Sequence, residues 1–80
     1  MIQVIYYAGA ADAAGDDAVE VDPGGPMTVA ELVTLLGTGN EAFADALEAC
    51  TVLVDGEAAP PDALVPADAR VDVMPPFAGG

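Results

Sequence analysis

The feature that most constrains this chain is one capped amphipathic segment, residues 28–37, with short alternating segments on both sides of it. Thr28 and Glu31 have the spacing of a capping box, in which the two residues satisfy each other's backbone N–H groups. Apolar residues follow at the spacing that forms one stripe along a helix, namely Val29, Leu32, Val33 and Leu36. Gly37 stands where a left-handed C-terminal residue is common. The pattern predicts a helix that begins at Thr28 and packs one face against a sheet.

Two segments before this helix have the period of a strand. In residues 2–8 the even-numbered residues are all apolar and share one face. Residues 18–22 alternate valine with acidic side chains, which is typical of a strand buried on one side. Residues 9–17 between them are small, polar and glycine-bearing, without a periodic face, so we expect a turn of hairpin-loop length there. The second strand is therefore predicted to run antiparallel to the first.

The chain after the first helix predicts a second, shorter helix and a third strand. Asn40 can cap a helix whose apolar residues repeat the same spacing, namely Phe43, Ala46, Leu47 and Cys50. Residues 51–57 form a strand pattern that ends at Asp55-Gly56, a dipeptide that favours tight turns between paired strands. We expect Cys50 to pack against the core, because it shares a helical face with apolar residues.

The remaining segment contains a connection and a last strand. Three prolines exclude a long regular element from residues 58–69, where Leu64 and Val65 are expected to fix the connection to the core. Residues 70–74 then alternate two inward valines with outward Arg70 and Asp72. Pro75 ends this strand, because proline cannot donate to a strand ladder.

The order of these elements predicts the fold class. A hairpin, a crossover helix and two later strands make a mixed sheet, and the right-handed crossover rule places the last strand parallel to the first, in mid-sheet. We therefore expect an α+β protein with a β-grasp (ubiquitin-like) fold, with four to five strands and one main helix packed on one face. Residues 1–74 are expected to form the domain and residues 75–80 a flexible, extended C-terminal tail.

Charge and composition exclude several classes of function. Fourteen acidic residues against Arg70 alone give a formal charge of −13, which repels nucleic acid and anionic membrane surfaces. A basic protein surface is one partner that fits, although solubility or the composition of the source would also explain the acidity. One cysteine and no histidine leave no expected metal site or internal disulfide. With no apolar segment of about 18 residues and no basic leader, a cytoplasmic location is expected.

Conventional catalytic motifs do not account for the sequence. Cys50 has no histidine to activate it. The acidic turn at residues 55–57 fits a turn better than a metal loop. The Pro-Gly-Gly at residues 23–25 lacks the spacing and lysine of a phosphate-binding loop, so any ATP is expected to be bound by a partner.

The tail is the segment that folding alone does not explain. Pro75 and Pro76 stiffen its start, and Phe77 is an isolated aromatic residue of the kind that docks in a partner's pocket. Gly79 and Gly80 have no side chain, so they can pass through a narrow channel. Six residues at the polyproline rise of about 3.1 Å reach roughly 19 Å. The terminal carboxylate could thus enter another protein's active site and be activated there as an acyl adenylate.

The sequence resembles the small, ubiquitin-like subunit of molybdopterin synthase along its whole length. The opening residues 2–15 and the ending Val-Asp-Val-Met-Pro-Pro-Phe-Ala-Gly-Gly carry this resemblance, and Pro75–Gly80 is its most diagnostic part. The family often has Arg-Glu where this chain has Ala11-Asp12, and Gly-Asp where it has Asp68-Ala69. These departures concern surface contacts and turn geometry, not the tail.

The resemblance implies a non-catalytic sulfur carrier in molybdenum cofactor biosynthesis. An E1-like adenylyltransferase would activate Gly80 with ATP, and a sulfur donor protein would convert it to a thiocarboxylate. The tail would then insert into the large subunit, in a heterotetramer, and give sulfur to the cyclic pterin precursor. Gly79 would thread the channel, while Pro75, Pro76, Phe77 and Ala78 would contribute to docking. The carrier itself would hold no stable cofactor.

Two alternatives remain open at this point. The same activated tail could serve thiamine or cysteine synthesis, tRNA thiolation or ubiquitin-like conjugation. Alternatively, the chain could be a non-reactive binding module whose tail only docks. The absence of lysine excludes chains of this protein linked through its own lysines.

Overall fold

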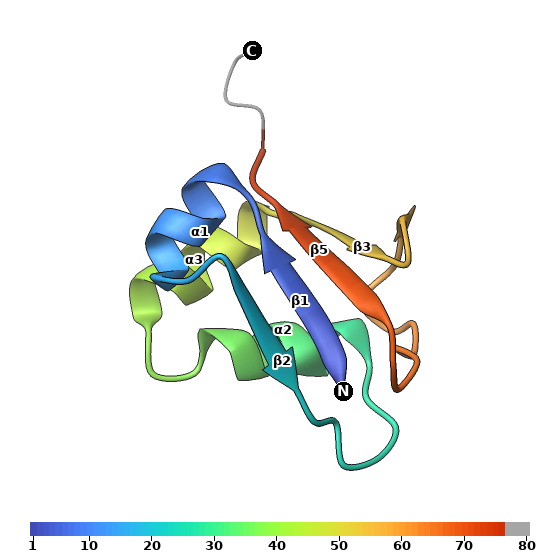
Figure 1. Cartoon of the computed structure of the whole chain (residues 1–80). Coiled ribbons are helices and arrows are strands. Elements are labelled where there is room, and N and C mark those ends of the chain that lie inside the picture. The colour runs from blue at the N-terminus through green and yellow to red at the C-terminus, as the bar shows by residue number, and fades with distance from the viewer. Residues whose placement is uncertain (77–80) are drawn as a thin grey trace.

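Five strands and three helices are formed by residues 1–76, which are the residues that the computed structural model describes (Figure 1). The strands are β1 (Ile2–Tyr6), β2 (Ala18–Val21), β3 (Thr51–Val54), β4 (Glu57–Ala58) and β5 (Arg70–Met74). The helices are α1 (Ala8–Ala14), α2 (Val29–Gly37) and α3 (Glu41–Ala49). None of these helices has the length and apolar character that crossing a lipid bilayer requires.

The strands form one mixed sheet in the order β2-β1-β5-β3-β4. β5 is parallel to β1 and antiparallel to β3, and the two outer pairs, β1 with β2 and β3 with β4, are antiparallel. The predicted position of the last strand, parallel to the first and in mid-sheet, is confirmed. The arrangement is the expected β-grasp fold.

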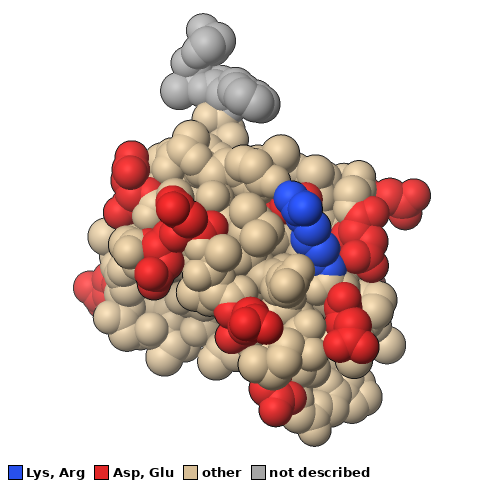
Figure 2. Space-filling model, viewed as in Figure 1, with Lys and Arg blue, Asp and Glu red and all other residues tan. Residues whose placement is uncertain are grey.

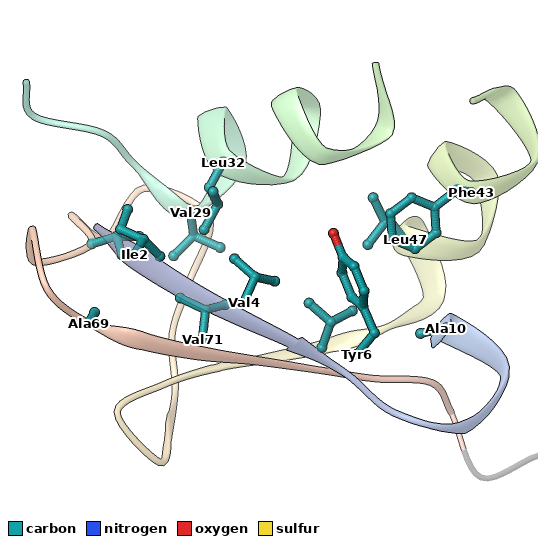
Figure 3. Close-up of a cluster of buried hydrophobic side chains, with 12 residues drawn as sticks. Ile2, Val4, Tyr6, Ala10, Val29, Leu32, Phe43, Leu47, Ala69 and Val71 are labelled. Atoms are coloured by element: carbon teal, nitrogen blue, oxygen red, sulfur yellow. The ribbon is translucent and has the colours of Figure 1, made fainter. Parts of the chain in front are cut away.

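The core lies between the sheet and the helices (Figure 3). Val4 and Tyr6 of β1 and Val71 of β5 point toward the helices, where Leu32 of α2 meets them. The Tyr6 ring packs edge-on against Phe43 of α3, with ring centroids 5.1 Å apart and planes at 83°. Burial of these side chains removes apolar area from water and is the main term that stabilises the fold.

Two side-chain caps fix where the helices begin. The predicted capping box is confirmed: the Glu31 N–H donates to Thr28 Oγ1 at 3.1 Å, and the Thr28 N–H donates to Glu31 Oε1 at 2.9 Å. At α3, Asn40 Oδ1 accepts from the Phe43 N–H at 3.1 Å. Both caps satisfy backbone donors that would otherwise have no intrahelical partner.

The prediction of a turn at residues 9–17 is wrong, because residues 8–14 form the helix α1. The first strand accordingly ends at Tyr6 and not at Ala8, which has a φ of 48°. Alanine is the best helix former, and Ala10 is buried although it is too small to produce a visible apolar stripe. Gly15, with a φ of 82°, ends the helix in the left-handed conformation. Tertiary packing thus selected a helix that periodicity did not indicate.

The expected left-handed conformation at Gly37 is also wrong. Gly37 is the last residue of α2, and the positive φ falls two residues later, at Gly39 (83°). Gly37 is required for a different reason: a Cβ placed on it would lie 2.9 Å from the Ala44 Cβ and 3.0 Å from the Ala44 Cα. The missing side chain therefore allows α2 and α3 to approach each other closely.

Replacing Gly37 with alanine should destabilise the protein by about 1–3 kcal/mol, because the new methyl group overlaps with the backbone of α3. The gain in helix propensity, up to about 1 kcal/mol, offsets only part of this cost. Gly9→Ala in α1 is the matched control, because a Cβ there meets nothing within 4 Å. Urea unfolding of both variants checks the prediction, and equal midpoints would contradict it.

One of the two residues predicted to fix the connection before β5 to the core does so. Val65 is buried, with 6% of its surface exposed, whereas Leu64 is 65% exposed, so the expectation that both residues pack into the core is wrong for Leu64. The segment is extended here, since Leu64 bridges Thr28 and the Val65 N–H donates to the Met27 carbonyl at 2.8 Å. Successive residues of extended backbone point to opposite sides, so only one of the two reaches the core.

Candidate functional site

The base of the tail is the end of the central strand. β5 is hydrogen-bonded on both sides, and its last residue, Met74, pairs with Thr51 of β3. On the other side the Tyr7 N–H donates to the Val73 carbonyl at 3.2 Å. The chain that leaves β5 therefore begins from a strand with a neighbour on each side.

Two of the predicted site residues lie within the described part of the chain. Pro75 and Pro76 directly follow β5, as expected for residues that end a strand; Pro75 is half-buried and Pro76 is exposed. The other predicted site residues, Phe77, Ala78, Gly79 and Gly80, lie outside the described residues. Their roles stay predictions.

A cluster of polar side chains lies beside this base, on the sheet face opposite the helices. Arg70 Nε donates to Asp72 Oδ1 at 3.1 Å, and Arg70 Nη2 donates to the Tyr7 hydroxyl at 3.0 Å. The Tyr7 hydroxyl donates in turn to Asp72 Oδ1 at 3.1 Å. The hydrogen bond to Asp72, followed by that to Tyr7, raises the pKa of the Arg70 guanidinium, so the group remains charged.

Sequence reasoning placed Asp72 outward and did not connect it with Tyr7. Asp72 does lie on the outer face, but it is buried, because the side chains of Tyr7 and Arg70 satisfy and cover its carboxylate. Two signals were present in the sequence. Arg70 and Asp72 are two residues apart and so share one strand face, and the predicted parallel pairing brings the end of β1 beside β5.

The surroundings of Cys50 do not favour a reactive thiol. It follows α3, is half-buried against the core, and its Sγ donates to the Ala46 carbonyl at 3.2 Å. Burial raises the pKa of the Cys50 thiol, so the nucleophilic thiolate is disfavoured at neutral pH. Cys50 thus packs against the core as expected.

An apolar groove of about 690 Å³ lies between α2, α3 and β3, with Val33, Leu47 and Val52 among its lining residues. Glu48 and Cys50 are the acidic and thiol groups on its wall. Within residues 1–76, no three His, Cys, Asp or Glu side chains are grouped to hold a metal ion.

Comparison with known proteins assigns the chain to a protein family. The family model described as the ThiS family matches residues 4–80. No curated protein sequence matches significantly.

Several solved structures have the same fold. SAMP1 from Haloferax volcanii is 26% identical, with a TM-score of 0.86 over 99% of this chain and 98% of that one. A putative molybdopterin converting factor, subunit 1, from Pyrococcus furiosus is 22% identical, with a TM-score of 0.77 over 95% and 97%. The small archaeal modifier protein 1 (SAMP1) from Methanosarcina acetivorans is 15% identical, with a TM-score of 0.81 over 99% and 95%.

Proposed function

Because the chain belongs to the ThiS family of small ubiquitin-like carriers, we propose that it carries sulfur as a thiocarboxylate on Gly80 for the synthesis of the molybdenum cofactor. In this role it is the small subunit of molybdopterin synthase, and the catalytic residues belong to the large subunit. The reaction takes place in the cytoplasm.

The observation that carries this proposal is the position of β5. The strand that precedes the tail lies in the middle of the sheet, between β1 and β3, and ends at Met74, directly before Pro75 and Pro76. A tail fixed to the central strand can be inserted into a partner without disturbing the core. The Pro-Pro-Phe-Ala-Gly-Gly sequence that follows is the part that supports the molybdopterin branch of the family.

The proposed chemistry divides between this chain and its partners. A Gly80 carboxylate oxygen attacks the α-phosphorus of ATP on the E1-like enzyme, and pyrophosphate leaves. The donor protein then delivers sulfur at the oxidation level of hydrosulfide, and this sulfur attacks the acyl carbon. AMP leaves with the electron pair of the broken bond, and the product is the thiocarboxylate. Gly79 passes through the channel, and Phe77, Ala78 and the two prolines position the end. ATP is bound by the activating partner and not by this chain.

A second function, modification of other proteins, is favoured by one comparison. The Haloferax volcanii structure that is 26% identical to this chain is of a small archaeal modifier protein. The same Gly80 adenylate could be attacked by a lysine amine of a target protein, with AMP again leaving and an isopeptide bond forming. This chain has no lysine, so conjugates would not extend through its own side chains.

Intact-mass spectrometry tests both functions. The full chain is incubated with the E1-like enzyme, ATP and a sulfur donor, and we expect the mass to rise by the difference between one sulfur and one oxygen. Addition of the large subunit and the cyclic pterin precursor should then return the chain to its carboxylate form. An unchanged mass with an enzyme that demonstrably consumes ATP would contradict sulfur carriage, and gel-shifted conjugates in a lysate would favour the modifier.

A further inference from the structure

The face of the sheet opposite the helices is a surface that the fold leaves uncovered. Alternate residues of the four longer strands lie on it, and Ile5, Leu53 and Met74 are half-buried apolar side chains among them. A hollow of about 310 Å³ adjoins Ile5, between β1 and β2. This face leads directly to the base of the tail, because Met74 is the last residue of β5. A partner that binds here would also be close to Pro75, the first residue after β5.

Arg70 lies on this face as a fixed positive charge. Its backbone is held by Asp55, whose carboxylate accepts from the Arg70 N–H at 3.0 Å and whose own N–H donates to the Arg70 carbonyl at 2.8 Å. Its side chain is held by Asp72 and Tyr7. A guanidinium fixed in this way loses little conformational freedom when it binds an acceptor.

The guanidinium also retains capacity to bind. Arginine has five N–H donors, and the hydrogen bonds within residues 1–76 engage one on Nε and one on Nη2. The Arg70 side chain is 57% exposed, whereas that of Asp72 is 11% exposed. The carboxylate is therefore enclosed within the cluster, and the remaining donors of Arg70 are the part of it that a partner can contact.

The charge around Arg70 has the opposite sign. The single basic side chain in Figure 2 is that of Arg70, and acidic side chains lie on several sides of it. This chain has a charge of −13, so it attracts a partner that has a basic surface. That attraction speeds the encounter of the two proteins but does not fix their relative orientation. A single carboxylate within the partner's basic surface is attracted to Arg70 and is repelled by the acidic residues around it. The two proteins therefore favour the orientation in which this carboxylate faces Arg70.

On the basis of the proposed function, we propose that Arg70 determines specificity by pairing with a carboxylate of the E1-like activating enzyme. The occupant of the face is thus a protein surface with a basic rim, an apolar centre and one acidic side chain opposite Arg70. The activating enzyme is the fitting partner, because sulfur carriage and protein modification both require adenylation. Arg70 is a docking residue and takes no part in the chemistry.

The test measures ATP–pyrophosphate exchange by the E1-like enzyme while the concentration of the carrier is varied. Arg70→Gln should raise the KM for the carrier about tenfold or more with kcat nearly unchanged, as expected when an interaction common to ground and transition states is lost. Arg70→Lys should retain part of the affinity. Thr34→Glu, at an exposed position of α2, changes the net charge by the same amount and should change KM by less than about twofold.

Two further variants make the result decisive. Removing Arg70 alone leaves the enclosed Asp72 carboxylate without its cation, which can destabilise the fold. The double variant Arg70→Gln with Asp72→Asn removes both charges, so it separates the loss of docking from a loss of stability. The acidic residues of the E1-like enzyme are changed to lysine one at a time. The change that reverses the charge opposite Arg70 should restore exchange with the Arg70→Glu carrier. Equal KM values for Arg70→Gln and Thr34→Glu would overturn this inference alone. No exchange with the wild-type chain would overturn the proposed function and the inference with it.

Discussion

Removing Gly80 should abolish thiocarboxylate formation while leaving the fold intact. In the proposed function, the terminal carboxylate must reach the ATP site of the activating enzyme. Loss of one residue makes Gly79 the terminal residue and leaves its carboxylate about 3.1 Å short of the reacting position. A displacement of about 1 Å can cost a hundredfold in rate, so a threefold larger one should bring the product below detection. Intact mass after incubation with enzyme, ATP and sulfur donor measures the effect.

The control for this prediction separates chemistry from folding. Circular dichroism and thermal unfolding of the shortened chain should match those of the wild type, because the core residues lie within residues 1–73. Gly25→Ala is the matched glycine variant, since a Cβ there meets nothing within 4 Å, and it should accept sulfur normally. Sulfur incorporation into the shortened chain at the wild-type level would refute the assignment of Gly80 as the carrier residue.

Leu32→Ala should have the largest effect on stability, a loss of about 2–5 kcal/mol. Leu32 has no exposed surface and lies between α2 and the sheet, where it meets the valines of β1 and β5 (Figure 3). Its truncation removes apolar contacts and leaves a cavity in a small domain that has a single core cluster in its described part. A domain of this size has about 5–15 kcal/mol of stability at most. The melting temperature should therefore fall by about 10 °C or more.

Leu35→Ala provides the comparison within the same helix. Leu35 is 47% exposed, so the same chemical change removes little buried area, and alanine favours the helix. We expect its unfolding free energy to stay within about 0.5 kcal/mol of the wild type. Thermal or urea unfolding of both variants gives the difference, and comparable losses would show that the core is not where the structure places it.

The elements with strong local signals were predictable from the sequence. Thr28 and Glu31 fixed the start of α2, and Asn40 fixed that of α3, because capping is a contact between neighbours in the chain. Asp55-Gly56 adopts the left-handed pair, with φ of 50° and 85°, that a two-residue hairpin turn requires. Local rules and the handedness of crossovers then placed the last strand parallel to the first in mid-sheet, where the structure has it.

The features that were missed depend on contacts between distant residues. α1 is stabilised by the tertiary environment of small alanines, and Asn40 Nδ2 donates to the Ala13 carbonyl at 3.1 Å across 27 residues. The role of Gly37 is set by Ala44 in another helix. The enclosure of Asp72 depends on Tyr7, which is 65 residues away in the chain. Only the folded topology brings these pairs together.

The candidate site divides in the same way. Pro75 and Pro76 could be identified from their position, because prolines directly after an alternating segment end a strand. The cluster of Arg70, Asp72 and Tyr7 was missed despite the shared strand face of Arg70 and Asp72, because an alternating strand with a charged outer face usually exposes both charges to water. The pairing of β1 with β5 is what converts these residues into one preorganised group.

The central position of β5 also determines how the protein responds to tension. A partner that pulls on Pro75 applies force along the axis of β5, whose hydrogen bonds with β1 and β3 lie across that axis. These bonds are loaded in shear and must break together, whereas a strand at the sheet edge pulled sideways would unzip one bond at a time. This resistance to tension suits the proposed function, in which partners capture and release the C-terminus repeatedly.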